Sequence, residues 1–316
     1  MATILGAMLG ISMIKVAESS PEINPNNILL NLDQNSKIYD KDGKLIESLA
    51  YDEYREIVKI KDIPKHLQQA FVSIEDERFY KHHGVDPISI ARAFLSNISS
   101  GGISQGGSTI TQQLVKNVYL TDDVAWERKI VEMYLALQVE TKIDKDEILE
   151  GYLNRVFMGQ HAYGVQAASE TYFSKPVSEL NLKQAAALAS IVQAPSSYAL
   201  FDLYRPADVP EGAKVLTDYN LYGEKYVAVA NDTILSRVDS TLHKMLELGY
   251  INEDEYKEAK DFDLMASVAP SNKLDITYPS HISGLIKKQA IKEIMKTQNM
   301  DEKEANNLLY TGGLSI

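Results

Sequence analysis

The chain has 316 residues, 45% of them apolar and 24% charged, which is the balance of a globular protein with one large domain or two moderate ones. Its formal net charge of −12 argues against nucleic acid as the main partner, because a duplex requires a basic protein face. It contains no cysteine, which excludes disulfides and thiolate metal sites.

The chain begins with an uncharged apolar run. Residues 1–14 carry no charge and Lys15 ends the run, whereas about 20 apolar residues are needed to span a bilayer. The run fits the outer end of a membrane helix, a short signal-like segment without its basic leader, or a buried helix. Because the polar stretch 18–27 follows at once, we expect a truncated membrane anchor over 1–17 and a linker over 18–35.

The next part of the chain carries a hairpin signal followed by helical periodicity. Asp42-Gly43 predicts the turn of a β-hairpin over 38–47. The glycine-rich stretch 99–107 predicts a mobile loop, and 207–229 is expected to be an irregular insertion. Apolar residues at helical spacing predict helices over 63–74, 87–98, 124–143, 144–154 with Asp144 as its cap, 180–192, 233–248, 252–260 and, as one or two helices, 279–309.

The most informative segment is Gly106-Gly-Ser-Thr-Ile-Thr-Gln-Gln-Leu-Val-Lys-Asn117. Its two glycines allow an open turn whose backbone can approach a ligand closely. Five hydrogen-bonding side chains then fall within six positions, and Lys116 and Asn117 follow about one turn later. We predict a loop that runs into a helix and holds something polar and anionic. The alternative is a glycine turn in which Ser or Thr caps an ordinary helix.

A second cluster lies around Glu75 and Asp76, at the end of an apolar helix and close to aromatic residues. Partial desolvation there would raise the pKa of a carboxyl group, which suits a general base that works near neutral pH. The alternative is a surface group of acids that pair with Arg78 and Lys81.

A third cluster combines Arg128, Lys129 and Glu132, whose spacing places them on one helical face. They form either a carboxylate beside two phosphate-binding cations or a surface ion pair worth only about 0.3–0.5 kcal/mol. The segment 145–154 carries an apolar stripe and is interpreted mainly as scaffold. Arg237, within a later helix, is weak evidence of a site when taken alone.

Together and in this order, these clusters resemble the peptidoglycan glycosyltransferase (transglycosylase) domain of class A penicillin-binding proteins and their monofunctional relatives. The family motifs E-D-x-x-F-Y-x-H-x-G-x-D, G-G-S-T-I-T-Q-Q-L-x-K-N, R-K-x-x-E and K-x-x-I-L-E-x-Y-L-N are matched at 75–86, 106–117, 128–132 and 145–154. A last arginine motif is met loosely by Arg237, Leu242 and Met245, and Asp122-Asp123-Val124 stands where many relatives carry a basic residue.

The resemblance implies a mainly α-helical, lysozyme-like fold with a head lobe and a smaller, membrane-dipping jaw lobe, besides the small hairpin near the N-terminus. It places the glycosyltransferase domain at 36–265. Residues 266–316 resemble the linker that leads to a transpeptidase domain in bifunctional members, and no such domain follows in this chain.

The resemblance also implies a reaction. Lipid II would be polymerised into β-1,4-linked glycan with inversion and release of undecaprenyl pyrophosphate. Glu75 would match the general base and Glu132 the second carboxylate, near the donor or its metal-associated pyrophosphate. The remaining positions would match substrate-binding residues: Asp76, Phe79, Ser108, Thr111, Gln112, Gln113 and Asn117, with Lys116, Arg128, Lys129 and Arg237 as cations for the leaving group.

The cofactor and partners follow from the same resemblance. A divalent cation, Mg²⁺ or Mn²⁺, is possible at the pyrophosphate, although the sequence has no metal motif of its own. The expected partners are lipid II, the growing glycan strand, the membrane and the cell-wall synthesis machinery, and a moenomycin-type inhibitor is expected to bind. The catalytic domain would face the extracytoplasmic side of a bacterial cell membrane and be held by a single N-terminal anchor.

Two other classes of function share parts of this pattern. A muramidase-like hydrolase or lytic transglycosylase would also use paired acids, but it needs no cations for a pyrophosphate, so Lys116, Arg128 and Lys129 discriminate against it. An inactive cell-wall binding module would be expected to lose Glu75 or Glu132, and both acids are present.

Overall fold

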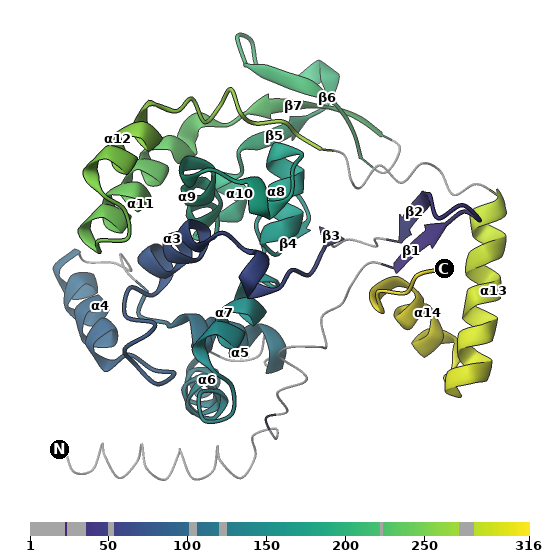
Figure 1. Ribbon diagram of the computed structural model, residues 1–316, viewed down its shortest axis with the longest axis horizontal. Coiled ribbons are helices and arrows are strands. Elements are labelled where there is room, and N and C mark those ends of the chain that lie inside the picture. The colour runs from purple at the N-terminus through teal and green to yellow at the C-terminus, as the bar shows by residue number, and fades with distance from the viewer. Residues whose placement is uncertain are drawn as a thin grey trace. The chain divides into compact units, whose positions relative to one another are not determined.

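The computed structural model describes residue 23 and residues 36–49, 54–100, 106–119, 125–221, 224–271 and 281–316. The chain divides into two compact units, a first unit of residues 1–31 and 71–155 and a second unit of residues 32–70 and 156–316. Figure 1 labels the helices and strands of the described residues. Most of the described residues are helical, so the predicted mainly α class is confirmed. The expected anchor over 1–17 lies outside the described residues, and no described helix has the length and apolar character to cross a bilayer.

The first unit is built from helices joined by short connections. It contains the end of α3 (Lys65–Glu75), then α4 (Pro87–Ser100), α5 (Ile110–Tyr119), α6 (Ala125–Val139) and α7 (Lys145–Leu153). α7 begins where the sequence predicts, because Asp144 and Glu147 form a reciprocal capping box at its N-terminus. α6 is shorter than the predicted helix over 124–143, since residues 140–144 form a turn before α7.

The loop after α3 passes close to the backbone of α6. Gly84 adopts a φ of 89°, and a Cβ atom added there would lie 2.5 Å from the carbonyl oxygen of Ala136. A side chain at this position would therefore meet both backbone strain and a collision with α6. The Gly84 carbonyl in turn accepts a hydrogen bond of 2.6 Å from the Thr109 hydroxyl, just before α5.

The second unit contains the remaining helices and all of the sheets. Its helices are α8 (Val165–Phe173), α9 (Leu182–Ile191), α10 (Pro195–Tyr198), α11 (Leu235–Glu247), α12 (Glu253–Asp261), α13 (His281–Gln298) and α14 (Glu302–Thr311), with 3₁₀ turns at Ile60–Asp62, Val177–Glu179, Pro206–Asp208 and Asp232–Ile234. α9 is buried along its whole length, and its small alanines allow α11 to pack closely on it. A short parallel pair joins β3 (Tyr54–Arg55) to β4 (Ala162–Tyr163).

The expectation that 207–229 is irregular is wrong. β5 (Phe201–Tyr204), β6 (Val215–Leu221) and β7 (Glu224–Ala230) form an antiparallel sheet in the order β5-β7-β6. β6 is mostly exposed and only Tyr219 on it is buried, so its sequence lacks the alternation that predicts a half-buried strand. Its strand conformation depends on backbone pairing with β7.

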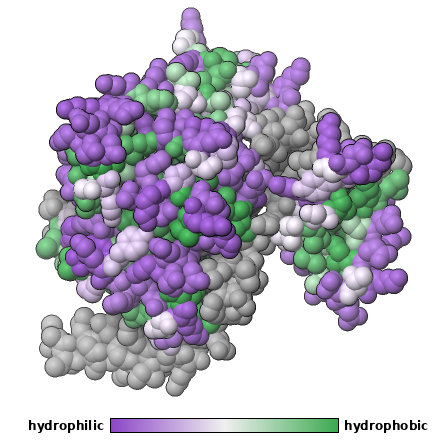
Figure 2. Space-filling model, in the orientation of Figure 1, coloured by the Kyte–Doolittle hydropathy of each residue, from purple (hydrophilic) through white to green (hydrophobic). Residues whose placement is uncertain are grey.

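Both ends of the described chain contribute to a separate small core in the second unit. β1 (Ser36–Tyr39) and β2 (Leu45–Leu49) form the predicted hairpin, and the last residues of the chain run beside β1. The backbone N–H of Lys37 donates to the Leu314 carbonyl, that of Ile316 to the Lys37 carbonyl, and that of Tyr39 to the Ile316 carbonyl. Ile38, Leu49 and Leu309 are fully or almost fully buried here. Figure 2 shows apolar side chains on the visible face of this part, over α13 and α14.

Candidate active site

Glu75 is the last residue of α3, and its half-buried carboxylate lies beside α5. The side-chain amide of Gln113 donates a hydrogen bond of 2.9 Å to its Oε2 atom. Helix α5 therefore presents a neutral amide donor to this acid.

Glu132, on α6, is the second carboxylate, and it is buried. The amide of Gln112 donates a hydrogen bond of 3.0 Å to its Oε1 atom, and the same oxygen pairs with the ammonium of Lys129. Two consecutive glutamines of α5 thus hold the two predicted catalytic acids, Gln113 on Glu75 and Gln112 on Glu132.

The start of α5 explains why Gln112 points where it does. Thr109 and Gln112 form a reciprocal cap. The backbone N–H of Gln112 donates to the Thr109 hydroxyl oxygen, and the backbone N–H of Thr109 donates to Oε1 of the Gln112 side chain, both at 3.1 Å. Because the oxygen of the Gln112 side chain is occupied by the cap, its NH₂ group faces Glu132. One pattern, T-x-x-Q, therefore both begins the helix and orients a site residue.

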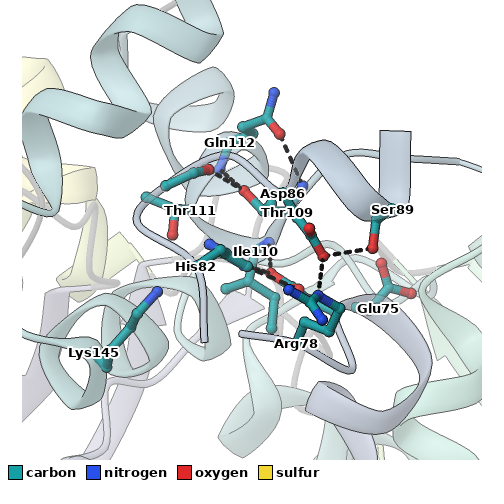
Figure 3. Close-up of polar contacts among 12 residues, drawn as sticks. Glu75, Arg78, His82, Asp86, Ser89, Thr109, Ile110, Thr111, Gln112 and Lys145 are labelled. Carbon is teal, nitrogen blue, oxygen red and sulfur yellow. Dashed lines mark hydrogen bonds and ion pairs between the residues drawn. The ribbon is translucent and has the colours of Figure 1, made fainter. Parts of the chain in front are cut away.

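Asp76 and His82 join the loop after α3 to the N-terminus of α5. Figure 3 labels His82 and Ile110 among these polar contacts. The buried Asp76 carboxylate accepts hydrogen bonds of 3.0 Å from the backbone N–H of Ile110 and of 2.9 Å from the His82 Nε2 atom. A carboxylate at the N-terminus of a helix is favoured by the helix dipole. Asp76 thus fixes α5 relative to Glu75, and a substrate contact by this residue remains a prediction.

A second buried acid, Glu140, lies on the other side of His82. Its Oε1 atom accepts hydrogen bonds of 2.6 Å from the Thr111 hydroxyl and 2.7 Å from the Lys145 ammonium, and it lies 3.9 Å from His82 Nδ1. Lys145 also lies over the ring of Phe79, 4.5 Å from its centroid. Thr111 and Phe79 are fully buried in these contacts, and their predicted role in substrate binding is untested.

Asp86 ends the loop with an ion pair to Arg78, whose Nε atom lies 3.0 Å from Oδ2 (Figure 3). Burial by itself raises the pKa of Asp86, but hydrogen bonds from the Ser89 side chain, from backbone N–H groups and the charge of Arg78 bring this pKa below its usual 3.8. The carboxylate therefore remains charged and caps the start of α4, with Ile88 N–H donating to it at 3.0 Å.

The predicted cations of the first unit differ in their surroundings. Lys129 already has partners within the protein, because its ammonium donates a hydrogen bond of 2.7 Å to the Ser108 hydroxyl and pairs with Glu132. Lys116 and Asn117 are exposed on α5. Neither Lys116 nor Arg128 forms an ion pair with any acid in the described part of the chain.

Arg237 belongs to the second unit, on α11. Its Nε atom donates a hydrogen bond of 3.0 Å to the Ser190 carbonyl, and its guanidinium lies 5.7 Å from the centroid of the Tyr198 ring. These contacts tie α11 to α9 and α10. The predicted substrate contact of Arg237 is untested.

No group of three or more His, Cys, Asp or Glu side chains within the described ranges is arranged to hold a metal ion. Glu132, the acid assigned to the donor side, is already engaged by Gln112 and Lys129. A divalent cation at the pyrophosphate therefore stays a prediction.

Sequence reasoning did not assign three residues that the structure places among these contacts. The buried Glu140 carboxylate and the half-buried Lys145 ammonium form an ion pair, and the hydroxyl of Tyr152 donates to Gln113, 3.4 Å from its Oε1 atom. Lys145 and Tyr152 are within the matched segment 145–154, but their apolar neighbours led to an interpretation as scaffold. Nothing in the sequence distinguishes Glu140 from an exposed acid at the end of a helix.

Comparison with known proteins gives one family and a set of longer relatives. A family model described as Transglycosylase matches residues 42–218. Penicillin-binding protein 1A of Clostridium perfringens (strain ATCC 13124) is 39% identical over 315 residues, which cover 98% of this chain and 35% of that protein. Penicillin-binding protein 1F of Bacillus subtilis (strain 168) is 48% identical over 170 residues, which cover 54% of this chain and 24% of that protein.

A crystal structure of penicillin-binding protein 1A from Haemophilus influenzae also matches, with 22% identity and a TM-score of 0.41 over 91% of this chain and 27% of that chain. That likeness is too low to support an argument about shape. The chain spans about a third of the length of the Clostridium perfringens relative, 35%.

Proposed function

Because this chain belongs to the transglycosylase family of peptidoglycan glycosyltransferases, we propose that it polymerises lipid II into β-1,4-linked glycan and releases undecaprenyl pyrophosphate. In the proposed step the 4-hydroxyl oxygen of the acceptor sugar attacks C1 of the donor, while the bond from C1 to the pyrophosphate oxygen breaks with inversion. The hydroxyl proton passes to Glu75, and the bonding electrons leave with the diphosphate.

The observation that carries the proposal is the environment of Glu75. A base for a sugar hydroxyl must be ionised and must be held in one orientation. The Gln113 amide donates to the carboxylate at 2.9 Å, and a donated hydrogen bond favours the ionised form and fixes one orientation. Glu75 therefore has the surroundings that suit a general base.

The leaving group requires positive charge more than a proton donor, since a pyrophosphate is already a stable anion. Lys116 follows Gln113 by three residues on α5, so the two side chains lie on one side of that helix. Lys116 and Arg128 lack acidic partners among the described residues, and this supports their assignment to the diphosphate. Lys129, with Ser108 and Glu132, would add charge from α6.

The exposed face of α4 supports a position at the membrane surface, where a lipid-linked substrate resides. Its large apolar side chains are exposed: Ile88 by 57%, Ile90 by 39%, Phe94 by 65% and Leu95 by 67%. A helix face of this kind is suited to lie in the interfacial region of a bilayer. We propose that this face contacts the outer leaflet of the bacterial cell membrane.

The test is an assay of the 316-residue chain with purified lipid II in detergent, with glycan polymer measured by gel separation. We expect polymer from the natural sequence, none when a moenomycin-type inhibitor is present, and at least about a thousandfold less from Glu75→Gln, since the amide cannot accept the proton. Equal activity of Glu75→Gln would remove this residue from the mechanism. Cleavage of finished glycan instead of polymerisation would favour the hydrolase.

A second variant examines the leaving-group cations. Lys116→Ala is expected to lower kcat/KM by about tenfold to a hundredfold, because one charge-assisted contact to the diphosphate is lost. Lys142→Ala is the control, because Lys142 is exposed on the turn after α6 and, among the residues that the structure describes, its ammonium donates to the backbone carbonyl of Ile23 and pairs with no acid. Equal kinetics of the Lys116 and Lys142 variants would contradict the assignment.

A further inference from the structure

The hydroxyl of Tyr152 is aimed at the amide that holds Glu75. Tyr152 lies on α7, its side chain is fully buried, and its ring packs edge-on against Phe71 with centroids 6.2 Å apart. Its hydroxyl lies 3.4 Å from Oε1 of Gln113, while Nε2 of the same amide lies 2.9 Å from Glu75. The three side chains form a line from α7 through α5 to the end of α3.

The chemistry of the three groups fixes the direction of every hydrogen bond in this line. An ionised carboxylate can only accept, so the NH₂ group of Gln113 must face Glu75. The oxygen of that amide then faces Tyr152, and only a protonated phenol can donate to it. Burial, followed by the charges of Glu75 and Asp76, raises the pKa of Tyr152 well above 10.0, so the phenol keeps its proton at physiological pH.

We propose that Tyr152 and Gln113 are positioning residues, in which the phenol hydroxyl orients the carboxamide and the carboxamide presents the Glu75 carboxylate to the acceptor hydroxyl. This inference rests on the proposed role of Glu75 as the base. If the phenol is removed, the Gln113 carboxamide keeps its contact with Glu75 but loses the contact at its other end, so its NH₂ group is held less firmly in the orientation that donates to the carboxylate.

The expected consequence is a change in the pH at which the base becomes active. A hydrogen bond donated to a carboxylate favours its ionised form, so losing that bond raises the pKa at which the base gains a proton. The variants below change none of the charged groups nearest to this line in the sequence. They are Asp76, Glu77 and Arg78 after α3, with Arg78 paired to Asp86, and Lys116, three residues after Gln113 on α5.

The test is the pH dependence of kcat/KM for lipid II polymerisation by the full chain. The acid limb of this profile is the range in which kcat/KM falls as pH is lowered, because the base becomes protonated. In Gln113→Leu the acid limb should move to higher pH by about one unit, the size expected for one hydrogen bond to a charged group. Tyr152→Phe, which keeps the ring against Phe71, should move the limb in the same direction by less. At pH values above both limbs the variants should approach the natural activity.

The double variant separates positioning from packing. If Tyr152 acts through Gln113, then Tyr152→Phe adds no further shift in the Gln113→Leu background, because the relay is already broken. A role in packing alone would lower activity at every pH and leave the acid limb in place. Tyr134→Phe on α6 is the matched control, since the Tyr134 hydroxyl has no hydrogen bond to any described residue, and it should leave the limb unchanged.

Several results would overturn the inference. One is an acid limb of Tyr152→Phe at the same pH as that of the natural sequence. Another is a shift caused by Tyr152→Phe that is equally large in the natural sequence and in the Gln113→Leu background. If Tyr152→Phe fails to fold in thermal unfolding, an unshifted limb in Gln113→Leu alone would suffice. Failure of the proposed function is a different result, in which the natural sequence makes no polymer or Glu75→Gln remains active.

Discussion

Two clusters in this molecule join distant segments of the chain by different forces. The polar cluster of the first unit connects the loop after α3 to α5, to α7 and to the turn after α6 through hydrogen bonds; it is made of Asp76, His82, Thr111, Glu140 and Lys145. The apolar cluster of the second unit, centred on Ile38, Leu49 and Leu309, connects the β1–β2 hairpin to α13 and α14 through side-chain packing.

The difference determines what each cluster tolerates. Buried polar groups need partners of the right kind in the right direction, and one lost partner costs the desolvation of the group that remains. Apolar packing accepts changes that conserve volume at little cost. The polar cluster therefore holds the side chains of the neighbouring acids in one arrangement. The apolar cluster stabilises the fold but does not fix the orientation of individual side chains to the same degree.

The largest expected effect separates two glycines that share a left-handed backbone, Gly84 beside the polar cluster and Gly43 in the β1–β2 hairpin, with φ of 89° and 79°. Gly84→Ala adds a Cβ atom 2.5 Å from the Ala136 carbonyl oxygen, while the same change at Gly43 meets nothing within 4 Å. We expect Gly84→Ala to lower the free energy of unfolding by about 3–5 kcal/mol, from strain and overpacking together.

Gly43→Ala is the control and should cost only about 1–2 kcal/mol, the strain of the backbone alone. Urea denaturation followed by circular dichroism measures both values. Equal losses of unfolding free energy in the two variants would show that the close approach of the loop to α6 adds no cost to that of backbone strain. The predicted difference between the polar and the apolar region would then be wrong for these glycines.

The motifs and helix ends were predictable because their signals are local. Asp42-Gly43 marks the hairpin turn and Asp144 the start of α7, and in both cases neighbouring residues decide the structure. The loop that runs into a helix at 106–117 is confirmed for the same reason, since the Thr109–Gln112 cap is a pattern of four consecutive residues.

The contacts that arrange the candidate site depend on partners far apart in the sequence, and no local pattern contains them. Glu140 is buried because Thr111 and Lys145 reach it from two other helices. Tyr152 belongs to an apolar stripe, and only the position of α5 shows that its hydroxyl has a polar neighbour. β6 was missed likewise, because its partner β7 decides its conformation.

A smaller effect is expected when the Lys–Glu pair of each region is replaced by apolar residues of similar size. Lys145 pairs with Glu140 in the polar cluster at 2.7 Å, and Lys287 pairs with Glu47 beside the apolar cluster at 2.6 Å. Lys145→Met with Glu140→Leu should cost about 2–3 kcal/mol, because the buried Thr111 hydroxyl loses its acceptor.

In the second unit, Lys287→Met with Glu47→Leu should change stability by less than about 1 kcal/mol, since no other described side chain depends on that carboxylate. Thermal unfolding of both double variants decides between the outcomes. A loss at Lys287 and Glu47 as large as that at Lys145 and Glu140 would contradict the view that only the first pair belongs to a wider polar cluster.

The smallest expected effect depends on pH and concerns Asp86, whose pKa is lowered in the folded protein. A depressed pKa contributes stability above the unfolded value, near 3.9, and this contribution is lost as pH falls through the folded value. Asp86→Asn should therefore cost about 1–2 kcal/mol near pH 7, with a loss that shrinks as pH falls below about 4.

Asp40→Asn, in the β1–β2 hairpin, is the matched control for this last prediction. The Asp40 side chain accepts two backbone N–H groups, each at 2.9 Å, and an asparagine oxygen can accept them as well, so its cost should stay within about 0.5 kcal/mol. Urea denaturation between pH 2 and 7 measures both variants. If the loss at Asp86 stays constant over that range, the carboxylate is held by neutral hydrogen bonding alone and its charge pairing with Arg78 adds nothing to the stability of the loop.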